Sequence, residues 1–86
     1  MKIFAHERFQ RSYQNLPSPV QFKVDRQLKV LVTNLRHPSL QVKRVKGTNT
    51  IWEARVDLHY RMTFEMHGDA VYLRVVGNHD DVLKHP

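Results

Sequence analysis

The sequence predicts an α+β domain in which two N-terminal helices pack on a mainly antiparallel sheet of four to five strands. Three observations lead to this prediction. Apolar residues recur at helical spacing as far as residue 35, the period changes to two from residue 40 onward, and short turn signals separate the later segments. The 86 residues are expected to form one domain, residues 1–86, because so short a chain has no room for a second folded unit.

The first 35 residues contain a short strand candidate and two helix candidates. Residues 2–5 are largely apolar and suit a strand, whereas residues 6–16 carry three core candidates at helical spacing, Phe9, Tyr13 and Leu16. Ser18 is expected to cap the second helix, with Pro19 at its first position and Gln21 completing a capping box. This helix has one apolar stripe, formed by Val20, Val24, Leu28, Leu31 and Leu35.

Strand patterns occupy the rest of the chain. A strand through residues 40–44 leads into a turn at residues 47–49, and two further strands at residues 52–56 and 60–66 follow. Gly68-Asp69 suits a two-residue type II′ hairpin, because glycine comes first. That hairpin predicts four facing pairs: Met66 with Val71, Phe64 with Leu73, Met62 with Val75, and Arg61 with Val76. Asp80 is expected to cap a short C-terminal helical turn that ends at Lys84.

The period of two divides these strands into a core face and a polar face. The core face carries Trp52, Ala54, Val56, Tyr60, Met62, Phe64 and Met66. The polar face carries Glu53, Arg55, Arg61, Thr63 and Glu65, and we expect it to be partly open to solvent. Trp52, Tyr60 and Phe64 therefore suit the core better than they suit base stacking.

Two arginines are predicted to face each other on the polar side. The turn at residues 57–59 makes Arg55 the direct neighbour of Arg61, with their Cβ atoms roughly 5 Å apart. Like charges at facing positions destabilise a sheet unless a carboxylate or a bound anion offsets them. The Gly77-Asn78-His79 loop is expected at the edge of this pair. We therefore predict an anion site here, most simply for a phosphate.

Charge and composition narrow the class of protein. There are 14 Lys and Arg against 8 Asp and Glu, a formal charge of +6 with a sequence pI near 10.1, which favours a polyanionic partner such as nucleic acid. A merely basic, soluble protein is the alternative. The absence of cysteine excludes a disulfide framework and a thiolate metal site. No apolar run suits a membrane span, so a cytoplasmic location is expected.

The order of these segments resembles the RelE/ParE superfamily of toxins from type II toxin-antitoxin modules. The resemblance covers nearly the whole chain and is carried by the segments taken together, not by any one of them. Those segments are the two helices, residues 37–40, the turn at residues 45–47, and the strand sequences at residues 52–56, 60–64 and 75–79.

The resemblance implies a ribosome-dependent endoribonuclease that cleaves messenger RNA through attack of a ribose 2′-hydroxyl on the adjacent phosphate. It implies phosphate or transition-state stabilisation by Arg61, with Arg55 beside it, and proton transfer by His79, since histidine has an unperturbed pKa of about 6.5. RNA-backbone binding is assigned to four further cations: Lys43, Arg44, Lys46 and Arg74. It also implies a small acidic antitoxin as partner, in a possible hetero-oligomer, besides the ribosome and messenger RNA.

Three residues are secondary candidates. Glu53 stands where some RelE-like nucleases have a lysine, His85 falls near the C-terminal tyrosine of RelE, and His59 lies in the turn beside Arg61. The histidines lack the close spacing of a metal site, so neither a metal nor another cofactor is expected.

Simpler roles remain open for the main candidates. His79 suits a turn residue that ends the last strand, and Arg61 suits a partner of Glu53 or Glu65. The basic residues from Lys43 to Lys46 suit a solvated edge strand that discourages aggregation. For the whole protein, the alternatives are a ParE-like inhibitor of DNA gyrase without nuclease activity, or an inactive relative that only binds antitoxin or operator DNA.

Overall fold

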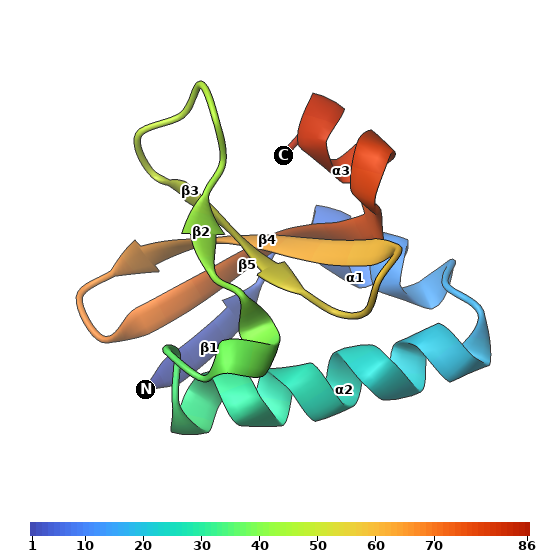
Figure 1. The fold of residues 1–86 in the computed structure, drawn as a ribbon, viewed down its shortest axis with the longest axis horizontal. Helices are drawn as coiled ribbons and strands as arrows, with labels where there is room; N and C mark the ends of the chain where they lie inside the picture. Colours follow the sequence, from blue (N-terminus) through green and yellow to red (C-terminus); the bar gives the residue numbers. More distant parts are fainter.

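The computed structural model describes residues 1–86 and contains one five-stranded sheet with three α-helices (Figure 1). The strands are β1 (Lys2–Ala5), β2 (Lys43–Arg44), β3 (Ile51–Arg55), β4 (Tyr60–His67) and β5 (Ala70–Asn78), and the helices are α1 (Glu7–Gln14), α2 (Ser18–Thr33) and α3 (His79–Lys84), with a 3-10 turn η1 at Pro38–Leu40. The sheet order is β1-β5-β4-β3-β2, with β1 parallel to β5 and the other neighbours antiparallel. The predicted fold class is confirmed.

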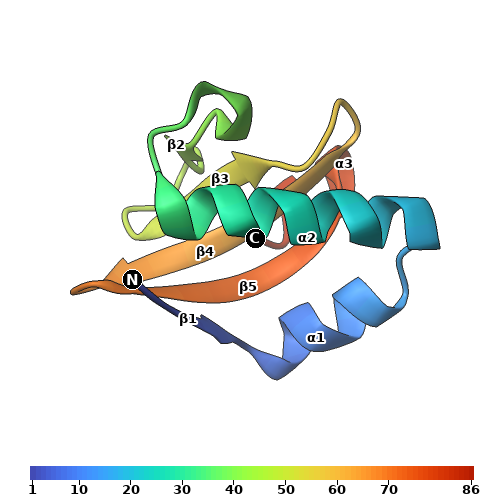
Figure 2. The same cartoon turned by 90° about the horizontal axis from the view of Figure 1, so that it is seen from below.

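Helix α2 lies across the inner face of the sheet (Figure 2). Its predicted stripe makes this contact: Val20, Val24 and Leu31 are buried, and Leu28 packs against the same cluster. Leu35 also packs there, although the helix ends at Thr33. The strands contribute the predicted core residues, among them Ala54, Val56, Met62 and Phe64. None of the helices has the length and apolar character that crossing a membrane requires.

Helix α1 protects the part of β5 that β1 does not reach. The backbone N–H of Val76 donates to Ser12 Oγ at 3.1 Å, which satisfies an edge donor that has no strand partner. Phe9 from the same helix is buried in the core cluster. The first helix therefore covers a sheet edge as well as contributing to the core.

Two predicted helix caps are wrong. The residue before α2 is Pro17, whose carbonyl accepts the N–H groups of Val20 and Gln21, and Ser18 is already helical. The Gln21 side chain donates to the Tyr13 carbonyl at 2.9 Å instead of completing a capping box. At the other end of the chain, Asn78 caps α3 in place of Asp80.

The predicted strand at residues 40–44 is mostly absent. Only Lys43 and Arg44 pair with β3, while Leu40 ends η1 with its side chain fully buried. Gln41 follows with a positive φ of 44°, which breaks the extended backbone. The buried leucine and the left-handed residue explain why alternation alone mispredicted this segment.

The hairpin between β4 and β5 begins in the predicted register. Gly68 has a φ of 62° and no positive φ follows at Asp69, as a type II′ turn requires. Met66 faces Val71 and Phe64 faces Leu73, as predicted.

The register then shifts by one residue. Met62 faces Val76 instead of Val75, and Arg61 faces Gly77 instead of Val76. Leu73 and Val76 both belong to the core cluster, which a regular strand forbids because residues three apart point to opposite faces. An additional residue between them, as in a β-bulge, restores the inward direction.

Candidate nucleic-acid site on the outer sheet face

The middle of the outer sheet face is covered by α3 and the last two residues. Thr63 Oγ1 donates to the Pro86 carbonyl at 2.8 Å, and Val82 from α3 is buried. A Cβ atom on Gly77 would lie 3.4 Å from Val82 Cγ2, so the glycine allows α3 to approach β5 closely. The outer face is consequently open only at its two sides, and the predicted Gly77–His79 loop is instead a strand end followed directly by a helix.

A cavity of about 330 Å³ lies on one side of α3. Figure 1 shows the β2–β3 connection on one flank of this region and α3 on the other. The cavity is lined by Lys43, Arg44, Val45, Lys46, Glu53 and Leu83. Lys43, Arg44 and Lys46 are exposed, so the predicted basic segment forms one rim. We call this cavity and its rim the basic groove.

Glu53 lies between two cations at the floor of the basic groove. Its side chain is only 5% exposed, with Oε1 4.0 Å from Lys43 Nζ and 3.9 Å from Arg61 Nε. A buried carboxylate needs such compensation, because leaving water costs a charged group much of its solvation. The interpretation of Arg61 as a partner of Glu53 is therefore supported, although the contact is at the limit of an ion pair.

The predicted pairing of Arg55 with Arg61 is confirmed in the sheet register. The two side chains differ in their contacts. Arg61 is 15% exposed, and its Nη1 donates to the carbonyls of Asp57, Leu58 and Tyr60, at 2.6, 3.4 and 3.0 Å. Arg55 is partly exposed and its guanidinium forms no hydrogen bond or ion pair. The pair therefore contains one anchored arginine, with Nη2 still unbonded, and one free arginine.

The β3–β4 turn that Arg61 holds is also fixed to α2. Asp57 Oδ1 accepts the N–H groups of His59 and Tyr60 at 2.8 and 2.9 Å, and Asp57 Oδ2 lies 3.0 Å from Lys23 Nζ. Burial alone would raise the pKa of the Asp57 carboxyl, but these hydrogen bonds and the Lys23 charge outweigh it and lower the pKa. The turn is thus a rigid support for this corner of the sheet.

His79 lies at the same corner. Its backbone N–H donates to the His59 carbonyl at 2.8 Å, which joins the start of α3 to the β3–β4 turn. The His79 ring is partly exposed, with Nδ1 3.4 Å from Asp80 Oδ1, and His59 is exposed. Because Gly77 faces Arg61, the structure brings Arg55, Arg61, His59 and His79 to one end of the sheet.

Two predicted residues lie apart from the basic groove. Arg74 contacts Glu65 at 3.1 Å, donates to the Pro86 carbonyl at 3.1 Å, and lines a separate cavity with His6, Glu7 and Arg8. His85 is exposed beyond α3, and its carbonyl accepts from Arg8. The four predicted RNA-binding cations are therefore not one cluster.

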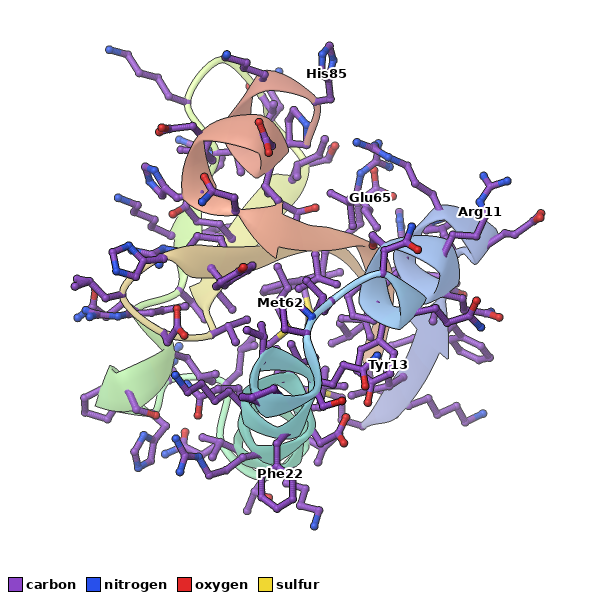
Figure 3. The ribbon with its side chains drawn as sticks, turned by 90° about the vertical axis from the view of Figure 1, so that its right-hand side faces the viewer. Arg11, Tyr13, Phe22, Met62, Glu65 and His85 are labelled. Carbon is purple, nitrogen blue, oxygen red and sulfur yellow. The ribbon has the colours of Figure 1, made fainter.

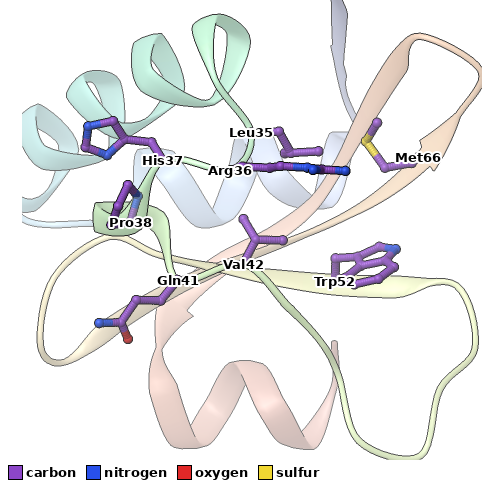
Figure 4. Close-up of a pocket in the computed structure, with 8 residues that line it drawn as sticks. All are labelled: Leu35, Arg36, His37, Pro38, Gln41, Val42, Trp52 and Met66. Atoms are coloured by element: carbon purple, nitrogen blue, oxygen red, sulfur yellow. The ribbon is translucent and has the colours of Figure 1, made fainter.

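The largest cavity, about 500 Å³, is elsewhere, between the end of α2, η1 and β3 (Figure 4). Trp52, Val42 and Met66 give it an apolar wall, and Arg36 and His37 are its only titratable side chains. It therefore lacks the convergence of charged groups found at the corner described above. No three His, Asp or Glu side chains lie where they would hold a metal ion.

The sequence analysis missed two features near the outer sheet face, the Asp57 anchor of the β3–β4 turn and the stacking of Phe4 on Tyr72. The Asp57 anchor has a local signal, an aspartate two and three residues before the N–H groups that it binds. The stacking of Phe4 on Tyr72 has none, since it depends on the parallel pairing of β1 with β5 across most of the chain.

Solved structures identify the architecture. The chain superimposes on YafQ from E. coli strain BL21(DE3) with a TM-score of 0.80 and 12% sequence identity, over 94% of this chain and 96% of that chain. This chain has the RelE/ParE toxin fold. The YoeB/ParE toxin from Agrobacterium tumefaciens has the same fold, with a TM-score of 0.75, 14% identity, and coverage of 92% of this chain and 99% of that chain.

A chain of the RelB-RelE antitoxin-toxin complex from Methanococcus jannaschii is a third example of the RelE/ParE fold. Its TM-score is 0.73 at 15% identity, covering 96% of this chain and 98% of that chain. No protein-family model matches the sequence, and no curated protein matches it either. The resemblance inferred from the sequence is thus confirmed at the level of the fold.

Proposed function

We propose that this protein is the toxin of a type II toxin-antitoxin module and acts as an endoribonuclease that cleaves messenger RNA on the ribosome. The observation that carries the proposal is the corner where the free Arg55 lies beside Arg61 and next to His79, in a chain with the RelE/ParE fold. Cationic and imidazole side chains suit phosphate charge stabilisation and proton transfer near neutral pH.

The proposed reaction is an internal phosphoryl transfer. The ribose 2′-oxygen loses its proton to a base and forms a bond to the adjacent phosphorus, while the bond from phosphorus to the 5′-oxygen breaks. The departing 5′-oxygen takes a proton. The products are a 2′,3′-cyclic phosphate on one fragment and a 5′-hydroxyl on the other, so atoms and charge balance without a co-reactant.

Each side chain at the corner has a proposed role. The Arg55 guanidinium and Arg61 Nη2 are free to bind phosphate oxygens, and a bound phosphate offsets the repulsion between the two arginines. His79 transfers one of the two protons, and His59, joined to it through the backbone, is the candidate for the other. A positioned group of this kind typically contributes about 10²- to 10⁴-fold in rate.

Glu53 is proposed to position cations instead of transferring protons. Its carboxylate lies between Lys43 and Arg61, so it would hold Lys43 at the groove and Arg61 beside it. Lys43, Arg44 and Lys46 are exposed along the rim, where they suit contacts with the RNA backbone.

A small acidic antitoxin is the proposed partner. Several of the similar solved structures are complexes, among them one described as RelB-RelE from Methanococcus jannaschii and one as DinJ-YafQ from E. coli. With a formal charge of +6 on this chain, an acidic segment over the basic groove would neutralise charge and block RNA together.

Induction of the protein in bacterial cells, followed by mapping of messenger RNA 5′ ends, tests the proposal. We expect new ends within coding regions, and their loss in the Arg55→Ala and His79→Ala variants. Intact transcripts accompanied by an SOS response would contradict nuclease activity and favour the ParE-like alternative, inhibition of DNA gyrase. Intact transcripts with normal growth would favour the inactive relative.

A further inference from the structure

A stacked aromatic pair lies on the outer sheet face at the β1 edge. The basic groove lies at the opposite edge of the sheet, beside β2 and β3. Phe4 of β1 and Tyr72 of β5 are direct partners in the parallel register, and their rings stack with centroids 5.0 Å apart at 18°. Ile3 packs against the core and Val71 and Leu73 are buried, so the alternation of each strand directs Phe4 and Tyr72 outward.

The stack is closed at one end and open at the other. The His67 ring meets Tyr72 edge-on, with centroids 5.2 Å apart at 76°. Phe4 lies on the edge strand, where no further strand follows, and it is 48% exposed. A large apolar side chain at such a position gains little from burial, yet it offers a ring with room for one more planar group.

Basic residues lie before and after Phe4 along the chain. Lys2 is exposed and, two residues before Phe4, lies on the same side of β1. On the other flank, a polar cavity of about 240 Å³ is lined by His6, Glu7, Arg8 and Arg74. Two of the nearby acids have basic partners: Glu65 contacts Arg74 at 3.1 Å, and Glu7 contacts Arg11 at 3.7 Å.

We propose that the Phe4–Tyr72 stack is a second RNA-binding site, on which an unpaired nucleobase stacks against Phe4 while Lys2 and Arg8 contact the flanking phosphates. Exposed aromatic rings beside cations are how proteins hold single strands with little sequence preference. The proposal deepens the function proposed above, since RNA is its ligand, but it requires neither cleavage nor the ribosome.

Binding of short single-stranded RNA to the purified protein tests this site. The probes are fluorescent oligouridylate and an abasic oligonucleotide of the same length and charge, compared by anisotropy at one salt concentration. We expect wild type to prefer the base-containing probe by about 5- to 150-fold, the usual range for one stacked base. The Phe4→Leu and Tyr72→Leu variants should lose this preference while keeping affinity for the abasic probe.

Two further variants keep the test selective. Tyr72→Phe retains the stacked ring and should retain the preference. Phe22→Leu removes a ring that is 77% exposed on the side of α2 that points away from the sheet, and it should bind both probes as wild type does (Figure 3). Because the readout is binding alone, failure of messenger RNA cleavage leaves this result unaffected.

Two results would overturn the second site. One is an equal preference for the base-containing probe in wild type and in Phe4→Leu. The other is unchanged RNA binding by Phe4→Leu together with weakened binding of a purified antitoxin, which would make the stack a protein interface.

Discussion

Arg55 and Arg61 are residues of the same type that face each other in the sheet, but their side chains make different contacts. Arg61 fastens the β3–β4 turn through three carbonyls and compensates the buried Glu53, whereas Arg55 makes no such contact. The N–H donors of Arg55 therefore have no partner within the protein and are available to solvent or to a bound anion.

This difference predicts unequal effects on stability. Arg61→Ala should lower the free energy of unfolding by about 1–3 kcal/mol, because it leaves turn carbonyls unbonded and Glu53 with Lys43 alone. Arg55→Ala should change it by less than about 0.5 kcal/mol, since only a like-charge neighbour is lost. Urea unfolding of both variants measures the difference, and equal losses would contradict the assignment of Arg61 as the anchored member.

Residue by residue, the sequence predicted positions better than contacts. Alternation was enough to place Arg55 opposite Arg61 and Glu53 on the same face. It gave no information on the direction of the Arg61 guanidinium, because that depends on carbonyls exposed by the shape of the turn. The separation of Arg74 from Lys43, Arg44 and Lys46 was not predicted either, since its contacts with Glu65 and Pro86 depend on the register shift and on the path of the chain end.

At the scale of elements, the corner is held from two sides, by α2 through the β3–β4 turn and by α3 through close packing on β5. Lys23 and Asp57 make the first connection, and Val82 over Gly77 makes the second. Each connection predicts a measurable effect.

The Asp57 connection should weaken in acid. Its folded-state pKa is lowered, so its contribution is complete above the ordinary aspartate pKa of about 3.9 and is lost as pH falls through the folded value. Asp57→Asn should therefore reduce stability by about 1–2 kcal/mol at neutral pH and by less near pH 3. Urea unfolding at both pH values checks this, with the exposed turn residue Asp69→Asn as control. A deficit of the same size at both pH values would refute it.

Substitution of Gly77 separates two opposing effects. Alanine at this position meets Val82 Cγ2 at 3.4 Å and should change stability by less than about 1 kcal/mol. Valine should lower it by about 1–3 kcal/mol through overpacking against α3, although valine by itself favours strands. Thermal and urea unfolding measure both variants. A stabilised Gly77→Val protein would show that α3 does not pack on this strand.

Helices and strands were predictable where an apolar pattern runs over many residues. They were not predictable where a single residue sets the strand register or the start of a helix. The stripe of α2 and the turns at Gly47 and Gly68 follow from local sequence. The sequence does not indicate the register shift in β5. Val75 and Val76 are adjacent apolar residues, and only the tertiary packing determines that Val76 belongs to the core cluster. β5 extends to Asn78 and α3 begins at His79, so the capping position falls on Asn78, whose Oδ1 accepts the Asp80 N–H.

For the whole molecule, charge and fold act together. The two helices and the later turn and strand sequences, taken together and in order, led to the RelE/ParE prediction, although the identity with each of the solved structures named above is 15% or less. The parallel pairing of β1 with β5 was not predicted, because neither strand contains a signal for a partner so distant in sequence. The composition gives only the total excess of basic residues, whereas the structure shows that three of them, Lys43, Arg44 and Lys46, line one groove.

The rim of the basic groove should dominate the salt dependence of RNA binding. Replacing Lys43, Arg44 and Lys46 by Gln should reduce the slope of log affinity against log salt by about 2, since each phosphate contact on a single strand contributes about 0.7. The matched control replaces three exposed cations on the helices, Arg11, Arg26 and Lys29. Equal slope changes in the two triple variants would mean that the groove has no special part in binding.

The most direct measurement is the chemistry of RNA ends after incubation of purified protein with ribosomes stalled on a defined messenger RNA. We expect fragments with a 2′,3′-cyclic phosphate and a 5′-hydroxyl. These fragments should be lost in Arg55→Ala and His79→Ala and retained in His37→Asn, which keeps an acceptor for the Ser39 N–H. Uncleaved messenger RNA, or cleavage that persists in both Arg55→Ala and His79→Ala, would contradict the proposed function.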